Sequence, residues 1–188
     1  RGYDPNTIVD DHKFEGGPSN ATNTYAGKIP LRYAVAKSLN TVAWQVYEQV
    51  TPKVGLQYLK NMNFSSIVKD DYTLATSLGG FTKGVSPLEM ASAYAALEND
   101  GMFRQPNCIK SIVDADENVV YSSQMAEVSI YEKDATRTMT DVLTTVMDSG
   151  TGAALKLSNM PCAGKTGTTN DHKDGWFVGY TRYYTTSV

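Results

Sequence analysis

The chain has 188 residues, of which 41% are hydrophobic and 20% are charged, and its formal net charge is −3. This composition is typical of a globular protein, and the length is sufficient for one domain, or a large part of one, with a buried core. The acidic balance argues against nucleic acid as the main partner. No apolar run reaches the roughly 18 residues that a membrane-spanning helix needs.

The first 30 residues are rich in Asp, Asn, Gly, Thr and Pro and predict a loop. From Leu31, apolar residues recur at spacings of three or four, which is the pattern of one helical face. The polar run AKSLNT interrupts this pattern, so we expect two helices that meet at Ser38–Asn40. Thr51 and Pro52 then predict the cap and the first residue of a third helix.

A long connection rich in turn-forming residues comes next, and the most clearly marked helix follows it. Ser86 is its predicted cap and Pro87 its first residue, while Glu89 completes a capping box. Gly101 is placed to end this helix. Over 107–122, two β-branched runs flank a turn-rich segment, a pattern that predicts a hairpin.

A further helix is predicted over about 133–147, and the glycine-containing run DSGTG ends it. The segment 162–188 alternates like strands, with Trp176, Val178 and Tyr180 on one face. Helices followed by an antiparallel pair or triplet of strands predict an α+β fold.

The two cysteines, Cys108 and Cys162, lie far apart and fit no metal-binding spacing. We expect two unpaired thiols, although a single disulfide stays open in an oxidising compartment. His12 and His172 have no ligand-like neighbours and are predicted to be surface residues. The sequence indicates neither a metal nor a cofactor.

The stretch GKTGTT places a cation, glycines and small hydroxyls at the start of a predicted strand. Lys165 and Gly167 share one face, and Thr166 and Thr168 share the other. A lysine with threonine hydroxyls suits a carboxylate, and a glycine lets a bound group approach the backbone closely. The N–H groups of a strand edge can also pair with an extended peptide. Alone, K-T-G is a common tripeptide with a structural role by default.

Ser38 and Asn40 alone are typical of a helix cap and a turn. Together with the later Lys165, however, they resemble the second and third motifs of the penicillin-interacting serine enzymes, whose set is S-x-x-K, S-x-N and K-T-G. The stretches LRYAVAKSLNTVAWQV, SLGGFTKGVSPLEMASAYAALENDG, SGTGAALK and AGKTGTTNDHKDGWFVGYT are similar, in order and wording, to class A, bifunctional penicillin-binding proteins. The resemblance covers about Gly27 to Val188.

The resemblance implies the fold shared by penicillin-binding transpeptidases and serine β-lactamases, a helical subdomain with an antiparallel sheet. One motif departs from the pattern, because nothing upstream of Ser38 has the form S-x-x-K. The run SIVK that begins at Ser66 comes in the wrong order and in a turn-rich stretch, so we do not interpret Ser66 as the nucleophile. We expect the nucleophile on an upstream segment that is absent from this chain.

The whole chain, 1–188, is therefore expected to be the C-terminal portion of one transpeptidase domain, with the fold incomplete. Its expected parts are a loop-rich entry over 1–30, a mainly helical part over 31–160 and the sheet strands that carry KTGT over 161–188.

By resemblance, the activity is acyl transfer on D-Ala-D-Ala stem peptides of peptidoglycan through a serine acyl-enzyme, with β-lactams entering as substrate mimics. Ser38 would bridge Lys165 and the lysine of the absent segment, and Asn40 would bind the substrate amide. Lys165 would supply positive charge for the terminal carboxylate. We expect Ser38 and Lys165 to lie in hydrogen-bond contact or one water apart.

The resemblance also assigns substrate-binding roles along the strand. The hydroxyls of Thr166 and Thr168 would bind the terminal carboxylate, and the Thr168 N–H would be one of two oxyanion donors. The complete substrate-binding set that it implies is Thr166, Gly167, Thr168 and Thr169.

Two other hypotheses stay open. A serine β-lactamase shares S-x-N and K-T-G but needs a positioned carboxylate for deacylation, and a non-catalytic penicillin-sensing or scaffolding domain would keep the same fold. The expected partners are peptidoglycan stem peptides, β-lactams and the upstream fragment with S-x-x-K, and not nucleic acid. The expected location is the extracytoplasmic face of a bacterial cell membrane, with an N-terminal anchor outside this chain.

Overall fold

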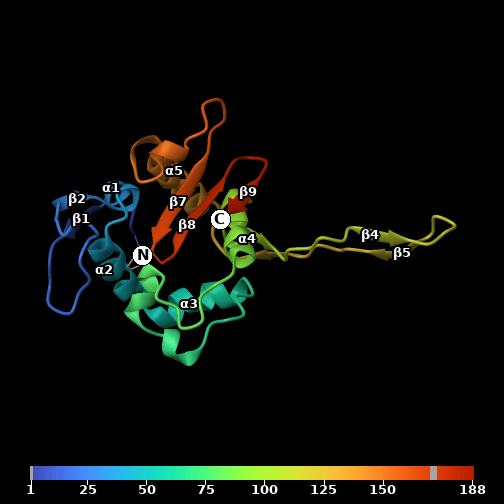
Figure 1. The fold of residues 1–188 in the computed structure, drawn as a ribbon, viewed down its shortest axis with the longest axis horizontal. Coiled ribbons are helices and arrows are strands. Elements are labelled where there is room, and N and C mark those ends of the chain that lie inside the picture. Colours follow the sequence, from blue (N-terminus) through green and yellow to red (C-terminus); the bar gives the residue numbers. More distant parts are fainter. Residues whose placement is uncertain (1, 170–172) are drawn as a thin grey trace.

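The computed structural model describes residues 2–169 and 173–188 (Figure 1). The chain opens with a two-stranded antiparallel sheet, β1 (Ile8–Asp11) and β2 (Gly27–Pro30). This strand pair corrects the prediction of a loop over 1–30. The strands have only four residues each, and the turn-forming residues between them masked the short alternation.

The next three helices follow the predicted pattern. They are α1 (Leu31–Ala36), α2 (Asn40–Val50) and α3 (Pro52–Asn61). The predicted break between the first two is confirmed, because Ser38 adopts a left-handed φ of 56° that no helix continues. Thr51 occupies the predicted cap position of α3, but its side chain makes no capping hydrogen bond.

The long connection contains two short 3₁₀ helices, Lys69–Asp71 and Leu74–Leu78. Asp71 holds this connection together and is fully buried. Its carboxylate accepts hydrogen bonds from the N–H and hydroxyl of Thr82, both at 2.7 Å, and from the Val68 N–H at 2.8 Å. One carboxylate thereby fixes both ends of the segment.

The helix α4 (Pro87–Glu98) is capped as predicted. The Ser86 Oγ accepts from the Glu89 N–H at 3.2 Å, and Glu89 Oε2 accepts from the Ser86 N–H at 2.7 Å. Gly101 follows with a φ of 90°, and an added Cβ there would lie 2.1 Å from the Tyr131 carbonyl oxygen. A glycine is therefore required at this position.

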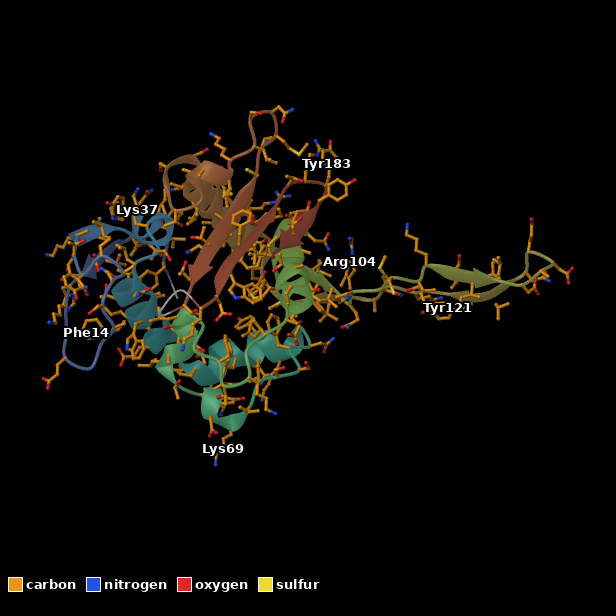
Figure 2. The ribbon with its side chains drawn as sticks, in the orientation of Figure 1. Phe14, Lys37, Lys69, Arg104, Tyr121 and Tyr183 are labelled. Carbon is orange, nitrogen blue, oxygen red and sulfur yellow. The ribbon has the colours of Figure 1, made fainter. Side chains whose placement is uncertain are left out.

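A long arm leaves the body of the molecule after α4 (Figure 1). At its base β3 (Met102–Arg104) pairs with β6 (Glu127–Ser129), a pairing that we did not predict. Its outer part is the predicted hairpin, β4 (Ser111–Val113) and β5 (Val119–Ser122). Figure 2 shows the side chain of Tyr121 on this outer part, away from the body.

The C-terminal part consists of α5 (Lys133–Ser149), a 3₁₀ turn (Ala153–Leu155) and a three-stranded antiparallel sheet. The strands are β7 (Ala163–Thr168), β8 (Gly175–Tyr180) and β9 (Thr185–Ser187), in that spatial order. The predicted α+β class is confirmed, and of the predicted pair or triplet of antiparallel strands the structure shows the triplet.

The helices α4 and α5 both pack against this sheet. One hydrophobic cluster joins α5 to the sheet through Leu143, Val146, Ala163 and Tyr180. A second lies between the helices and the base of the arm, and its buried members are Met62, Phe64, Ala96 and Phe103. In the described part of the chain, no helix is long and apolar enough to cross a bilayer.

Candidate active site

The Ser38 and Lys165 side chains meet although 127 positions separate them. The Lys165 Nζ donates a hydrogen bond to the Ser38 Oγ at 2.7 Å, and a second to the Thr166 carbonyl oxygen at 2.8 Å. The predicted contact between the S-x-N and K-T-G segments is confirmed.

Ser38 is brought to the sheet by a joint between the ends of α1 and α5. The Lys37 Nζ donates to the Ser149 carbonyl at 2.8 Å, and the Thr151 N–H donates to the Ala36 carbonyl at 3.0 Å. A Cβ on Gly150 would lie 2.4 Å from that same Ala36 oxygen. The run DSGTG therefore does more than end a helix, because Gly150 allows the ends of α1 and α5 to touch.

The backbone of β7 turns its polar groups alternately toward β8 and toward the opposite edge. Phe177 exchanges both of its hydrogen bonds with Val188, and Thr166 lies opposite Phe177. Thr166 and, two residues on, Thr168 are therefore non-hydrogen-bonded positions with respect to β8. Their N–H and C=O groups point away from β8, toward an edge that no other described strand covers.

The three threonines of the motif differ in how their hydroxyls are engaged. The Thr166 hydroxyl bonds that of Thr151 at 2.6 Å. The Thr169 hydroxyl accepts from the Asp174 N–H at 2.8 Å and closes the β7–β8 turn. Among the described residues, the exposed Thr168 hydroxyl has no hydrogen-bond partner. It is therefore the hydroxyl of this set that is most available to a ligand.

Burial lowers the pKa of Lys165 from its ordinary value of 10.5 to about 8. The ammonium form therefore predominates at neutral pH. Its side-chain hydrogen-bond partner, Ser38, is neutral, so the positive charge of Lys165 is not paired with a carboxylate there. Such a charge suits an anionic ligand.

These residues line one end of a groove of about 860 Å³. Its polar end carries Ser38, Asn40, Lys165, Thr166, Gly167, Thr168 and Thr169, so it contains every predicted site residue. Farther along, the lining is mostly apolar and comes from α1, α2, the segment 77–85, α4, α5 and β8, with Val35, Val42, Val46, Tyr94 and Val178 among its members. Neither Ser66 nor Lys69 lines the groove, and Ser66 lies outside any helix, as the sequence interpretation required.

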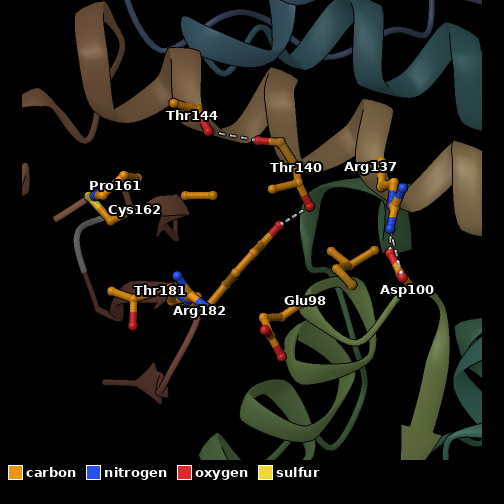
Figure 3. Close-up of a pocket in the computed structure, with 12 residues that line it drawn as sticks. Glu98, Asp100, Arg137, Thr140, Thr144, Pro161, Cys162, Thr181 and Arg182 are labelled. Carbon is orange, nitrogen blue, oxygen red and sulfur yellow. Dashed lines mark hydrogen bonds and ion pairs between the residues drawn. The ribbon is translucent and has the colours of Figure 1, made fainter.

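A second cavity of about 310 Å³ lies between the end of α4, α5 and the ends of β7 and β8 (Figure 3). Within it, the hydroxyls of Tyr180 and Thr140 are hydrogen-bonded at 2.8 Å, and Arg137 pairs with Asp100. None of the predicted site residues lines it. The half-buried Cys162 does, and both it and the exposed Cys108 are free thiols, as predicted.

Two residues whose hydrogen bonds join segments next to the site were not singled out from the sequence. Thr151 binds Ala36 through its N–H and Thr166 through its hydroxyl, so it joins both sides of the site. The only sequence signal was the run SGTG, which carried part of the family resemblance. Asp11, the second residue, is buried beneath the first turn of α2 and gave no signal at all.

The remaining predictions concern histidines and metals. His12 is exposed, as predicted, and its ring lies 3.6 Å from the carboxylate of Asp10. His172 falls outside the described residues. Across 2–169 and 173–188, no three His, Cys, Asp or Glu side chains are placed to hold a metal ion.

Comparison with known proteins identifies the family. The model of the penicillin binding protein transpeptidase domain matches residues 2–188. Penicillin-binding protein 4 of Bacillus subtilis (strain 168) is 32% identical over 190 residues, which cover 100% of this chain and 30% of that protein. Penicillin-binding protein 1A/1B of the same strain is 34% identical over 180 residues, which cover 87% of this chain and 20% of that protein. The chain thus spans less than a third of these relatives.

Solved structures show the same fold. PonA1 of Mycobacterium tuberculosis has a TM-score of 0.84 at 22% identity, over 99% of this chain and 54% of that one. Penicillin-binding protein 1A of Haemophilus influenzae has a TM-score of 0.83 at 20% identity, over 99% of this chain and 34% of that one. With its motifs in contact, its fold shared and its sequence matched throughout, the chain belongs to the transpeptidase domains of the penicillin-binding proteins and has class A members among its relatives.

Proposed function

We propose that this protein is a peptidoglycan D,D-transpeptidase that crosslinks D-Ala-D-Ala stem peptides through a serine acyl-enzyme and is inhibited by β-lactams. The observation that carries the proposal is the 2.7 Å contact between the Lys165 Nζ and the Ser38 Oγ. It brings two motifs of one reaction to the same end of one groove. Covalent catalysis of this kind divides a difficult acyl transfer into two easier steps.

Each group at the polar end has a role that its geometry favours. Lys165 supplies a cation for the terminal carboxylate of the stem peptide, and the Thr168 hydroxyl donates to that carboxylate. The Thr168 N–H points to the open edge of β7 and acts as one oxyanion donor. Ser38 relays protons between Lys165 and the nucleophile's own lysine, and Asn40 binds the substrate amide.

The edge of β7 also suits the substrate's shape. The outward N–H and C=O groups of Thr166 and Thr168 can pair with an extended peptide, as sheet edges do in other peptide complexes. Gly167 has no side chain between them, so a bound acyl group can lie against the strand. The Thr166 hydroxyl, held by Thr151, then contributes to orienting the strand as well as to binding.

We place the nucleophile on a segment of the protein outside 1–188, with the form S-x-x-K. The apolar part of the groove supports this placement, because the apolar face of a helix can pack against it next to Ser38. That helix would bring its serine to the polar end of the groove and bury its other apolar side chains.

The partners and the location follow the same proposal. A PonA1 structure is a complex with penicillin V, which supports binding of β-lactams at the corresponding site here. Since peptidoglycan lies outside the bacterial cell membrane, we place the domain on the extracytoplasmic face, attached through a part of the protein outside this chain.

The test is to incubate the full-length protein with fluorescent penicillin and to map the adduct by mass spectrometry of its peptides. We expect one penicilloyl group, on the serine of an S-x-x-K segment outside 1–188. An adduct on Ser66, or on any other serine of this chain, would show that the nucleophile has been misplaced.

Two further measurements separate the transpeptidase from the alternatives. Slow release of the bound penicillin is expected, whereas a serine β-lactamase would release it rapidly. Crosslinking of stem peptides in a reconstituted assay is also expected, whereas a penicillin-sensing or scaffolding domain would bind the drug without making crosslinks.

A further inference from the structure

Asp11 is a buried carboxylate without a cationic partner among the described residues. It lies at the end of β1 and is 1% exposed. Its Oδ1 accepts from the Thr41 hydroxyl and, at 2.7 Å, from the Asn20 amide, while its Oδ2 accepts from the Ala26 N–H at 2.7 Å. A buried charge persists only when its hydrogen bonds are satisfied, so the arrangement is built around this carboxylate.

The hydrogen bonds to Asp11 favour its ionised form. Burial acts to raise the pKa of Asp11, but the hydrogen bonds from Thr41, Asn20 and Ala26 outweigh it and hold the pKa below its ordinary value. The carboxylate therefore acts only as an acceptor at neutral pH, and each of its neighbours must present a donor to it.

This requirement fixes the orientation of Asn20. The Asn20 Nδ2 donates both to Asp11 and to the Thr24 carbonyl at 2.9 Å, and neither of these groups can donate in return. Its Oδ1 must then face the other way, toward the Thr41 N–H at 3.4 Å. That N–H belongs to the first turn of α2, which has no side-chain cap of its own.

The same loop holds Asn40. The Asn40 Nδ2 donates to the carbonyl of Ser19, the residue before Asn20, at 2.9 Å. One amide hydrogen of Asn40 is thereby engaged, and its other polar groups are left for the groove. Asp11 fixes Asn20 and Thr41. Asn20 directly follows Ser19 in the chain and Thr41 directly follows Asn40, so Asp11 holds the neighbours of both residues in the Ser19–Asn40 contact.

We propose that Asp11 is a positioning residue for the acyl-transfer reaction, which sets the place of the Asn40 amide through Asn20 and Thr41 without touching the substrate. The inference rests on the proposed function, since it assigns Asn40 to the substrate amide. It goes beyond the three family motifs, because Asp11 lies in none of them.

The test uses the full-length protein and two β-lactams that differ in the group that Asn40 would bind. Benzylpenicillin has an acylamino side chain, and 6-aminopenicillanic acid lacks it. In Asp11→Asn the new NH₂ group takes the place of Oδ1, where it faces Asn20 Nδ2 and the Thr41 hydroxyl, or of Oδ2, where it faces the Ala26 N–H. In either place it meets a group that only donates. We expect the second-order rate constant of acylation by benzylpenicillin to fall on the order of 10- to 100-fold, and that for 6-aminopenicillanic acid to fall much less.

Thr41 provides a paired test that does not depend on whether Asp11→Asn folds. Thr41→Ser keeps the hydroxyl and should react at the wild-type rate, while Thr41→Val should show the same preferential loss for benzylpenicillin. Combined with Asp11→Asn, Thr41→Val should add little further loss, because the two side chains act as one unit.

Asp100→Asn is the matched control for stability alone. It loses ion pairs with Arg137 and Lys133 on the surface, and none of these three residues lines the groove. We expect a lower melting temperature and unchanged acylation rates for the folded fraction.

The outcomes separate the two levels of the proposal. A wild-type protein that neither β-lactam acylates overturns the proposed function. A reactive wild type whose Asp11→Asn and Thr41→Val variants keep both rates, or lose both equally, overturns only the role of Asp11.

Discussion

The two sides of the groove are held in place by different means. The strand side, Lys165–Thr168 on β7, is fixed by the regular backbone ladder with β8 and by buried residues such as Ala163 and Val178. The turn side, Ser38–Asn40, has a left-handed residue and no ladder. It depends on hydrogen bonds with β1, with the loop after β1 and with the backbone at the end of α5. The strand side is therefore held by many equivalent backbone hydrogen bonds, whereas the turn side is sensitive to substitutions at residues far from the groove.

The largest expected effect comes from removing the side chain that joins the two sides. Lys165→Met should lower the rate of acylation by a β-lactam on the order of 10²–10⁴-fold, because it removes both the cation and the proton network at the reacting centre. Stopped-flow acylation of the full-length protein measures this. Lys156→Met, which removes a surface lysine paired with Asp148, is the control. Equal rates in the two variants would remove Lys165 from the site.

A smaller loss is expected when the strand side alone is changed. Thr168→Val keeps the shape but removes the hydroxyl, at a cost of about 1.5–3 kcal/mol for a hydrogen bond to a carboxylate. Capture of carboxylate-bearing β-lactams should weaken accordingly, while the melting temperature stays the same. Thr168→Ser should restore capture. If Thr168→Val acylates at the wild-type rate, this hydroxyl does not bind the carboxylate.

A change at the contact between the ends of α1 and α5, behind the turn side, should lower the free energy of unfolding. In Gly150→Ala the new Cβ would collide with the Ala36 carbonyl oxygen, and overpacking of this kind costs about 1–3 kcal/mol. Urea unfolding measures the loss. Gly175→Ala is the control, because no atom of the described residues lies within 4 Å of its added Cβ. The same stability in both variants would mean that the α1–α5 joint is not tight.

A dependence on pH is also expected at the contact between the two sides. As pH rises through about 8, Lys165 loses its charge, so non-covalent affinity for a carboxylate-bearing β-lactam should fall by up to about tenfold per pH unit.

The free energy of unfolding changes with pH in the opposite direction. The folded-state pKa lies below the ordinary 10.5, so burying the charged form costs free energy below about pH 8, and this cost is relieved between pH 8 and 10.5. Affinity that stays flat up to pH 10 in wild type would contradict the lowered pKa.

Sequence reasoning succeeded where structure is local. The capping box at Ser86, the break at Ser38 and the strands around Lys165 each follow from patterns within a few residues, and all are present. The meeting of Ser38 with Lys165 is not local, and only the family resemblance predicted it. Without the resemblance, the local sequence pattern predicted only structural roles for Ser38 and Lys165.

The missed features share a physical cause. The β3–β6 pairing joins strands on either side of the long arm, and its three-residue strands are too short to show a period. Asp11 and Thr151 each act through two or three hydrogen bonds to other segments, and isolated polar residues have no periodicity to detect. The turn side of the groove was accordingly the harder side to predict.

The outer hairpin of the arm has a consequence for how this domain can vary. Val119 and Val120 are consecutive and point to opposite faces, and they are 64% and 68% exposed, so neither face of the hairpin is covered within the described chain. A two-stranded hairpin without a covered face adds little to the stability of the whole. Within the described part of the chain, it joins the body through the β3–β6 base. Insertions, deletions and exchanges beyond that base can therefore accumulate without moving Ser38 or Lys165, which makes the arm a region where evolution can alter length and surface chemistry independently of catalysis.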